Sequence, residues 1–173
     1  MKMDAKRKTA SMKAIVTTRY GPPEVLQITE VEKPAPRDSE VMVKVYATTV
    51  SSGDCRMRSS HFPLRIWIPT RMMLGLTKPR KPIQGLYLAG EIETVGKDVK
   101  RFKKGDRVYA RTVDLQFGAY AEYACLPEES VGNSLLSLIP SNITYEERSL
   151  FPLAASPRCI FLGKLESEAD RMC

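Results

Sequence analysis

Residues 85–96 read GLYLAGEIETVG, and the basic stretch RFKKGDRV follows shortly after. A dinucleotide-binding loop requires the spacing G-x-G-x-x-G, and a triphosphate loop requires Lys and then Ser or Thr after its last glycine. Here the glycines stand five and six residues apart, and Gly90 is followed by Glu91. We therefore interpret the stretch as a strand over 86–95 rather than a phosphate loop. Gly90 is expected at a bulge or a close backbone approach, and Gly96 at a turn.

Short apolar segments on both sides of this stretch have the two-residue periodicity of strands. The clearest is EVMVKVYATTV at residues 40–50, one face of which holds Val41, Val43, Val45 and Ala47. Further strands are expected at four segments separated by Gly and Pro turns, namely residues 12–17, 25–31, 106–110 and 118–126. Many short strands with such turns predict a mainly β fold, in the form of a partly open β barrel with short helices.

Two helix starts are marked by side chains that can cap them. The stretch SSGDCRMRSS at residues 51–60 predicts a helix with Ser51 or Ser52 as its N-cap. Thr144, followed three residues later by Glu147, forms the capping-box pattern of a second helix.

Residues 61–82, HFPLRIWIPTRMMLGLTKPRKP, are both apolar and basic. Such a segment can lie on a membrane surface as an amphipathic helix. The prolines at positions 63, 69, 79 and 82 argue against one long helix. We therefore favour a long excursion packed over the domain, a kind of loop that often carries function.

Composition restricts the class of protein. The 173 residues are 43% apolar and 27% charged, as in soluble globular proteins. No apolar run approaches the roughly 20 residues of a membrane span, and the N-terminal MKMDAKRKTAS lacks the apolar core of a secretory signal. We expect a cytoplasmic protein without a membrane partner.

The formal net charge of +7 raises the question of an anionic partner. Seven basic residues and no Asp or Glu lie between Cys55 and Gly90, and a local basic surface can attract phosphate, acidic membranes or an anionic cofactor. No aromatic platform or nucleic-acid motif accompanies these charges. We therefore favour a solvated loop surface over a nucleic-acid footprint.

The four cysteines, at positions 55, 125, 159 and 173, have no short paired spacing, and His61 is the only histidine. A structural zinc site needs four Cys or His ligands, usually in closely spaced pairs. We therefore expect no metal site of this kind, and we interpret the cysteines as reduced, unpaired thiols.

Four stretches resemble, in order, the N-terminal domain of medium-chain dehydrogenases/reductases. They are residues 12–36, 40–58, 85–110 and 117–131, and the most specific piece is A-G-E-[IV]-x-x-V-G followed by R-F-K-x-G-D-R-V. The most similar subgroup is that of zinc-independent quinone oxidoreductases and NAD(P)-dependent alcohol-dehydrogenase-like proteins. The resemblance implies a GroES-like β barrel, here over residues 12–143, which the family follows with a Rossmann domain that binds NAD or NADP.

Zinc-dependent members of that family hold their catalytic zinc with a Cys three residues before a motif Asp and with a Gly-His-Glu. The matching positions here are Ser51, before Asp54, and Leu86 and Tyr87, after Gly85. A serine hydroxyl, a leucine and a phenol make a poor zinc-ligand set. The Cys-rich lobe that holds a structural zinc is also missing, so the resemblance implies a zinc-free reductase with no metal site.

Without zinc, the resemblance implies direct hydride transfer from NAD(P)H to a small quinone, enone or aldehyde. It places Ser51 and Asp54 at the cleft that faces the nicotinamide. Ser51 is a candidate to hydrogen-bond the cofactor or the substrate, or to cap a helix. Asp54 is a candidate to orient a hydroxyl or a water, or to make a structural hydrogen bond in the first helical turn. Tyr87 is a candidate donor to a substrate oxygen, or a packing aromatic, while His61 is given no catalytic role.

The end of the chain departs from the family. Pro157 and Arg158 stand where the family has a small Thr-Ala pair, and no glycine-rich nucleotide loop follows. We therefore expect residues 144–173 to be a truncated helical segment and the Rossmann domain to be absent, which leaves NAD(P)H binding by this chain weak or missing. Residues 1–11 are expected to be a disordered basic extension, and the apolar residues 151–162 to promote self-association.

Three functions stay open from the sequence alone. The first is the substrate-side domain of a zinc-free, NAD(P)H-dependent oxidoreductase, inactive by itself. The second is a non-catalytic remnant or interaction module that keeps the barrel. The third, and least favoured, is an RNA- or anion-binding protein that uses the basic surface over residues 55–90.

Overall fold

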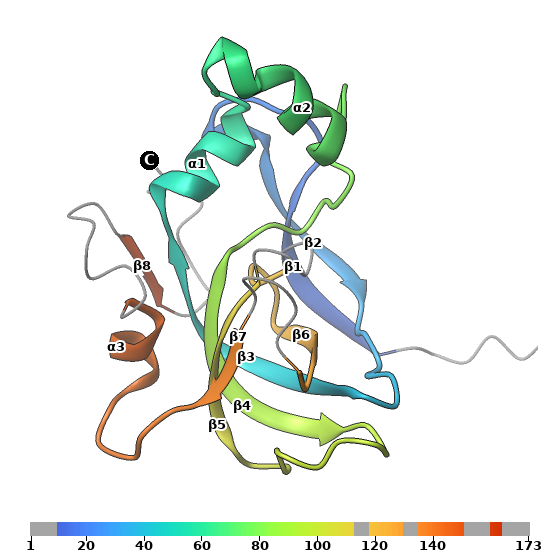
Figure 1. Cartoon of the computed structure of the whole chain (residues 1–173), viewed down its shortest axis with the longest axis vertical. Coiled ribbons are helices and arrows are strands. Elements are labelled where there is room, and N and C mark those ends of the chain that lie inside the picture. The colour runs from blue at the N-terminus through green and yellow to red at the C-terminus, as the bar shows by residue number, and fades with distance from the viewer. Residues whose placement is uncertain (1–9, 113–117, 130–134, 151–159, 164–173) are drawn as a thin grey trace, which may run out of the picture.

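The computed structural model describes residues 10–112, 118–129, 135–150 and 160–163. Within these residues the fold is mainly β, with two antiparallel sheets and a few short helices (Figure 1). The sheets curl into a half-barrel. The mainly β class and the partly open barrel expected from the sequence are confirmed.

The larger sheet forms the body of the barrel, and its strand order is β6-β3-β4-β5-β7. Its strands are β3 (Glu40–Val50), β4 (Tyr87–Val95), β5 (Arg107–Arg111), β6 (Tyr123–Pro127) and β7 (Leu135–Leu138), with β8 (Ile160–Gly163) also paired to β3. The smaller sheet pairs β1 (Ser11–Thr17) with β2 (Leu26–Glu32). The helices are η1 (Pro23–Val25), α1 (Ser52–Ser59), α2 (Leu64–Leu74) and α3 (Tyr145–Leu150).

Main-chain hydrogen bonds from β1 join the smaller sheet to the rest of the barrel. The Ile15 N–H donates to the Tyr120 carbonyl, and the Thr17 N–H donates to the Pro82 carbonyl, each at 2.8 Å. These contacts bring the segments before β4 and before β6 against one strand. The same two segments line the candidate site described below.

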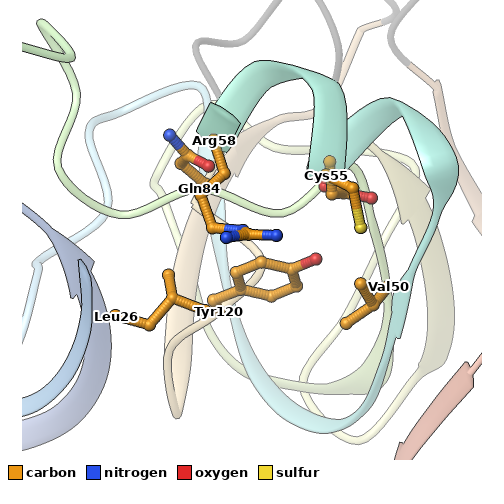
Figure 2. Close-up of a pocket in the computed structure, with 7 residues that line it drawn as sticks. Leu26, Val50, Cys55, Arg58, Gln84 and Tyr120 are labelled. Atoms are coloured by element: carbon orange, nitrogen blue, oxygen red, sulfur yellow. The ribbon is translucent and has the colours of Figure 1, made fainter. Parts of the chain in front are cut away.

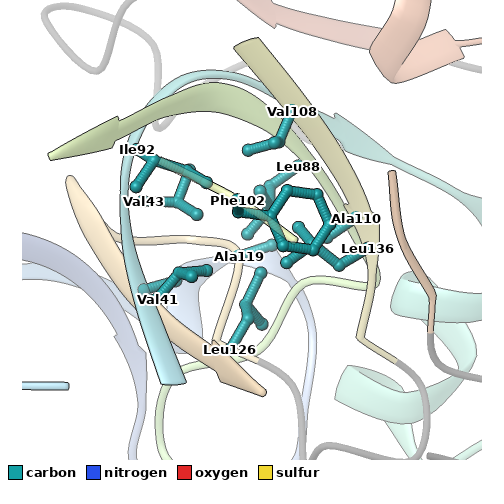
Figure 3. Packing of buried hydrophobic residues seen from close by; sticks show 11 residues of the cluster. Val41, Val43, Leu88, Ile92, Phe102, Val108, Ala110, Ala119, Leu126 and Leu136 are labelled. Atoms are coloured by element: carbon teal, nitrogen blue, oxygen red, sulfur yellow. The ribbon is translucent and has the colours of Figure 1, made fainter. Parts of the chain in front are cut away.

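The main cluster of buried apolar side chains is formed mostly by residues of the larger sheet (Figure 3). Its most deeply buried large side chains come from three neighbouring strands and are Val41, Val43, Leu88, Ile92 and Val108. Val41 and Val43 belong to this cluster as predicted, but Met42 between them is also buried. A register shift follows between Val45 and Ala47, and residues 47–50 are all buried. Ala47 packs in a second cluster with Ile139, and Val50 in a third with Ile15 and Tyr120.

Gly90 lies at the register shift between β3 and β4. A Cβ atom added there would overlap the Lys44 carbonyl oxygen and would lie only 2.9 Å from Val43 Cγ1. The close backbone approach expected from the sequence is therefore confirmed. Gly96 is held in the same way against the Arg37 and Asp38 carbonyls.

Both predicted helix caps are confirmed. The Glu147 N–H donates to Thr144 Oγ1 at 3.2 Å, and the Thr144 N–H donates to Glu147 Oε2 at 2.9 Å, which completes the capping box of α3. Ser51 caps α1.

Residues 61–82 differ from the expectation of a long excursion packed over the domain. They contain the 11-residue helix α2, with Pro69 inside it, and none of the residues of α2 is buried. Pro69 lacks an N–H and so donates no hydrogen bond within the helix. One such loss in a helix of three turns does not prevent the helix from forming here.

The predicted domain boundaries lie partly outside the described residues. Ser11 already pairs with Glu32 in the smaller sheet, whereas most of the extension predicted to be disordered, residues 1–9, is not described. Residues 160–163, in the stretch expected to be helical, form β8. The predicted self-association through residues 151–162 concerns side chains that are not described, and it stays a prediction.

Candidate functional site

The candidate site begins where β3 ends and α1 starts. The Ser51 N–H donates to Asp54 Oδ2 at 2.9 Å, the Ser51 hydroxyl donates to the same oxygen at 2.5 Å, and the Asp54 N–H donates to Ser51 Oγ at 3.3 Å. The two residues are 4% and 3% exposed. The structure thus brings together two of the three residues predicted for the site, and both of their predicted structural roles are present.

This arrangement determines what Ser51 can offer to another molecule. A serine hydroxyl has one proton to donate, together with acceptor lone pairs. The proton of Ser51 is directed at Asp54, and a charge-assisted bond of this kind is about twice as strong as a neutral one. As long as Asp54 is ionised, Ser51 is therefore an acceptor toward any further partner.

Three further buried polar side chains lie near Asp54 at one cavity. Arg58 is four residues after Asp54 on α1, while Gln84 before β4 and Tyr120 before β6 come from distant parts of the chain. Together with Asp54 and three apolar neighbours they line a cavity of about 10 Å³ (Figure 2). Figure 2 shows the Tyr120 ring between Leu26 and Val50.

The polar contacts around this cavity are incomplete. Arg58 Nη1 donates to the Gly21 carbonyl at 3.0 Å, and the Tyr120 hydroxyl makes only a long 3.5 Å contact to the Thr49 carbonyl. No described residue donates a hydrogen bond to Asp54 Oδ1. An ionised carboxylate with one unbonded oxygen in a buried site is costly.

The pKa values of these groups reflect their burial. Burial raises the pKa of Asp54 above its ordinary value, although hydrogen bonds from the Ser51 hydroxyl and N–H oppose the rise. Burial, and then the negative charge of Asp54, raise the pKa of Tyr120 well above its usual range. Burial also lowers the pKa of Arg58. Tyr120 therefore keeps its proton, and Asp54 is the group in this cluster whose charge responds to pH.

Sequence reasoning missed Arg58, Gln84 and Tyr120. Tyr120 was counted only as part of an expected strand, and Arg58 only as one of several basic residues. Gln84 and Tyr120 come from segments far from Asp54 in the chain, and no periodicity or local spacing in the sequence signals that they line one cavity with it. Arg58 stands four residues after Asp54 on α1, so the helical i, i+4 spacing could have indicated its position.

Tyr87, the third predicted residue, is the first residue of β4 and is half-buried. Leu86 and Leu88 on either side of it are buried, so its side chain lies on the opposite face of the strand. A Cβ atom on Gly53 would lie 3.2 Å from Leu86 Cδ1 and 3.3 Å from Ser51 Oγ. The residue that touches the start of α1 is thus Leu86, and the Tyr87 hydroxyl has no hydrogen bond to any described residue.

The cysteines differ from expectation at one position. Cys55 is disulfide-bonded, so the interpretation of all four cysteines as unpaired thiols is wrong for this residue. Cys125 is free, and burial raises its pKa to about 11. In the described part of the chain, no three His, Cys, Asp or Glu side chains gather in a way that could hold a metal ion.

Residues 37–135 match the family model of the alcohol dehydrogenase GroES-like domain. This range contains β3, α1, α2, β4, β5 and β6. The candidate site residues Ser51, Asp54 and Tyr87 all fall within it.

Individual relatives match most of this chain but a minor part of their own length. A quinone oxidoreductase of Sus scrofa is 31% identical over 152 residues, which are 87% of this chain and 40% of that protein. A chloroplastic NADPH-dependent alkenal/one oxidoreductase of Arabidopsis thaliana is 31% identical over 150 residues, 83% of this chain and 35% of that protein.

A solved structure likewise matches most of this chain but a minor part of its own length. The quinone oxidoreductase of Escherichia coli, complexed with NADPH, superposes with a TM-score of 0.59 and 26% identity, covering 78% of this chain and 35% of that one. This chain therefore spans 35% to 40% of the length of these three proteins.

Proposed function

Because the chain belongs to the family of alcohol dehydrogenase GroES-like domains, we propose that it provides the substrate-side domain of an NAD(P)H-dependent oxidoreductase. Its substrates are small quinones, enones or aldehydes. The relatives whose names state such activities support this class. The observation that carries the proposal is the buried Ser51–Asp54 pair at the end of β3, within the matched range.

The bound nicotinamide cofactor supplies the hydride, and the domain supplies orientation and polar contacts. We assign to Ser51 an accepting role toward the carboxamide N–H of the nicotinamide, since its own proton is directed at Asp54. We keep the sequence-based prediction of Tyr87 as the donor toward the substrate oxygen, where negative charge develops during hydride transfer, although its side chain lies on the other face of β4 from Leu86. Its hydroxyl is not engaged by any described residue.

The proposed chemistry is zinc-independent. Ser51, Leu86 and Tyr87 occupy the positions from which zinc-dependent relatives of this domain present thiolate and imidazole ligands, and none of the three is a good zinc ligand. A cytoplasmic location remains a sequence-based prediction.

A chimera tests the proposed function. Residues 1–153 are fused to the C-terminal part of the Sus scrofa quinone oxidoreductase that lies beyond the matched region, and NADPH oxidation is followed with a quinone, an enone and an aldehyde. We expect turnover with at least one substrate class, and a fall in kcat of about a hundredfold for Tyr87→Phe, the usual effect of losing an oxyanion donor. Tyr46→Phe, on the exposed side of β3, is the matched control and should leave kcat unchanged. A folded chimera that binds NADPH but reduces none of the three would overturn the proposal.

A second prediction concerns the 173-residue chain by itself. Dinucleotides are held mainly through their pyrophosphate, at a glycine-rich loop and helix N-terminus, and these 173 residues contain no G-x-G-x-x-G. We expect a fluorescence titration with NADPH to show no saturation in the micromolar range. A dissociation constant on the order of 1 μM would contradict the expectation that the barrel provides only one wall of the cofactor site.

A further inference from the structure

The exposed large apolar side chains of this protein are concentrated at one place. Of the eleven such side chains among the described residues, seven lie between positions 64 and 76, with exposed fractions from 41% to 85%. We call this set the α2 surface: Leu64, Ile66, Trp67, Ile68, Met72, Met73 and Leu76. Soluble proteins usually scatter their exposed apolar residues singly, and a contiguous group marks a site of interaction.

The α2 surface is held in place by ordered contacts. Arg71 lies over the Tyr20 ring at 4.0 Å and donates hydrogen bonds to Ser60 Oγ and the Leu76 carbonyl. The Tyr20 hydroxyl donates to the Gly75 carbonyl at 2.9 Å. Figure 1 shows α2 at one end of the long axis of the molecule, opposite the end formed by β4 and β5. The apolar side chains are thus presented by a helix that is fixed to the barrel at its C-terminal end.

The positive charge around the α2 surface favours a negatively charged partner. Four exposed basic side chains accompany it, namely Arg65, Lys78, Arg80 and Lys81. No Asp or Glu occurs between Cys55 and Gly90. Two copies of this chain docked through the α2 surface would bring these like charges together. An anionic partner would neutralise them.

We propose that the α2 surface docks on membranes that contain anionic lipids, with its apolar side chains in the boundary between headgroups and acyl chains and its basic side chains on the phosphates. Helices that lie in this boundary combine apolar and aromatic residues with Lys and Arg, and juxtaposed basic residues are attracted by the negative surface potential of such membranes. Among the helices of the described residues, none has the length and hydrophobicity of a membrane span.

This inference is independent of the proposed oxidoreductase function, because it uses none of the residues of the candidate site. It also reverses the preference drawn from the sequence, where a membrane-surface role of residues 61–82 was the less favoured alternative. The observed exposure of α2 is the reason for the change.

The chain contains a natural probe for the test, since Trp67 is its only tryptophan. The full chain is mixed with vesicles of phosphatidylcholine alone or of phosphatidylcholine with phosphatidylserine, and co-sedimentation and tryptophan emission are measured. We expect binding and a blue shift of emission with the anionic vesicles only, and weaker binding at high salt.

Variants locate the binding surface. Ile68→Glu with Met72→Glu, both at exposed positions, should reduce partitioning into anionic vesicles by at least about tenfold. Arg80→Glu with Lys81→Glu should remove the preference for anionic vesicles. The matched control is Ile28→Glu, at an exposed apolar residue of β2 with 50% exposure, and this variant should bind as the wild type does.

Three results would overturn the proposal. The first is equal binding to neutral and anionic vesicles, and the second is an equal loss in the Ile28→Glu control. The third is a concentration-dependent dimer without lipid that the Ile68→Glu, Met72→Glu variant abolishes, since a second copy would then cover the α2 surface.

Discussion

Gly90→Ala is expected to lower the free energy of unfolding by more than about 4 kcal/mol, the largest effect of any single substitution considered for this protein. The added methyl group would overlap the Lys44 carbonyl oxygen and crowd Val43 Cγ1. Lys44 lies in β3, the central strand that pairs with β4, β6 and β8. Its main chain cannot move away without disturbing these pairings.

The measurement is urea unfolding of the variant beside a control on the same strand. Thr94→Ala replaces an exposed residue of β4 and should change the free energy of unfolding by less than about 0.5 kcal/mol. If Gly90→Ala unfolded at the same urea concentration as Thr94→Ala, the close contact between β3 and β4 would not exist in solution.

Asp54→Ala is expected to destabilise the protein by about 3 kcal/mol. Its carboxylate accepts from both the N–H and the hydroxyl of Ser51. Removal leaves these two buried donors without their acceptor and ends the capping box of α1. Asp98→Ala, an exposed carboxylate, is the control and should be close to neutral. Thermal or urea unfolding measures both, and a loss below about 1 kcal/mol would contradict the structural role of the pair.

Asp54→Asn separates charge from shape, and the sign of its pH dependence follows from burial. The pKa of Asp54 is raised in the folded protein above its ordinary value of 3.8. The folded protein therefore retains a proton that the unfolded chain has released, so the contribution of Asp54 to stability is present below pH 3.8 and is lost as pH rises through the raised pKa. The difference in free energy of unfolding should shift in favour of the Asn variant from about pH 4 to about pH 7. A shift in favour of the wild type would show that the pKa of Asp54 is lowered instead.

Local features of this protein were predictable because the groups involved are close in sequence. The capping boxes that join Ser51 to Asp54 and Thr144 to Glu147 each span three residues, so the spacing alone indicates them. The strand over 86–95 and the tight position of Gly90 follow from apolar alternation and from the absence of a side chain. The family resemblance, through the motifs around Gly90 and Gly105, added the barrel, which the structure confirms.

Predictions failed where the outcome depends on contacts between distant segments. The alternation predicted for β3 fails at Met42 and at residues 47–50, which are all buried, because distant segments pack against them. Residues 61–82 were expected to form a long excursion packed over the domain, because their prolines argue against one long helix. The sequence of residues 61–82 does not indicate whether another element covers them. In the structure, none of the residues of α2 is buried.

The amino-acid sequence by itself determined strands β1 to β6, both helix caps and the family of this domain, since these depend on residue type and on short spacings. Only the tertiary structure showed strands β7 and β8, the cavity that Gln84 and Tyr120 line with Asp54, and the uncovered apolar surface of α2. Burial and the electrostatic environment of a side chain depend on which distant segments fold against it. These contacts between distant segments exist only in the folded barrel.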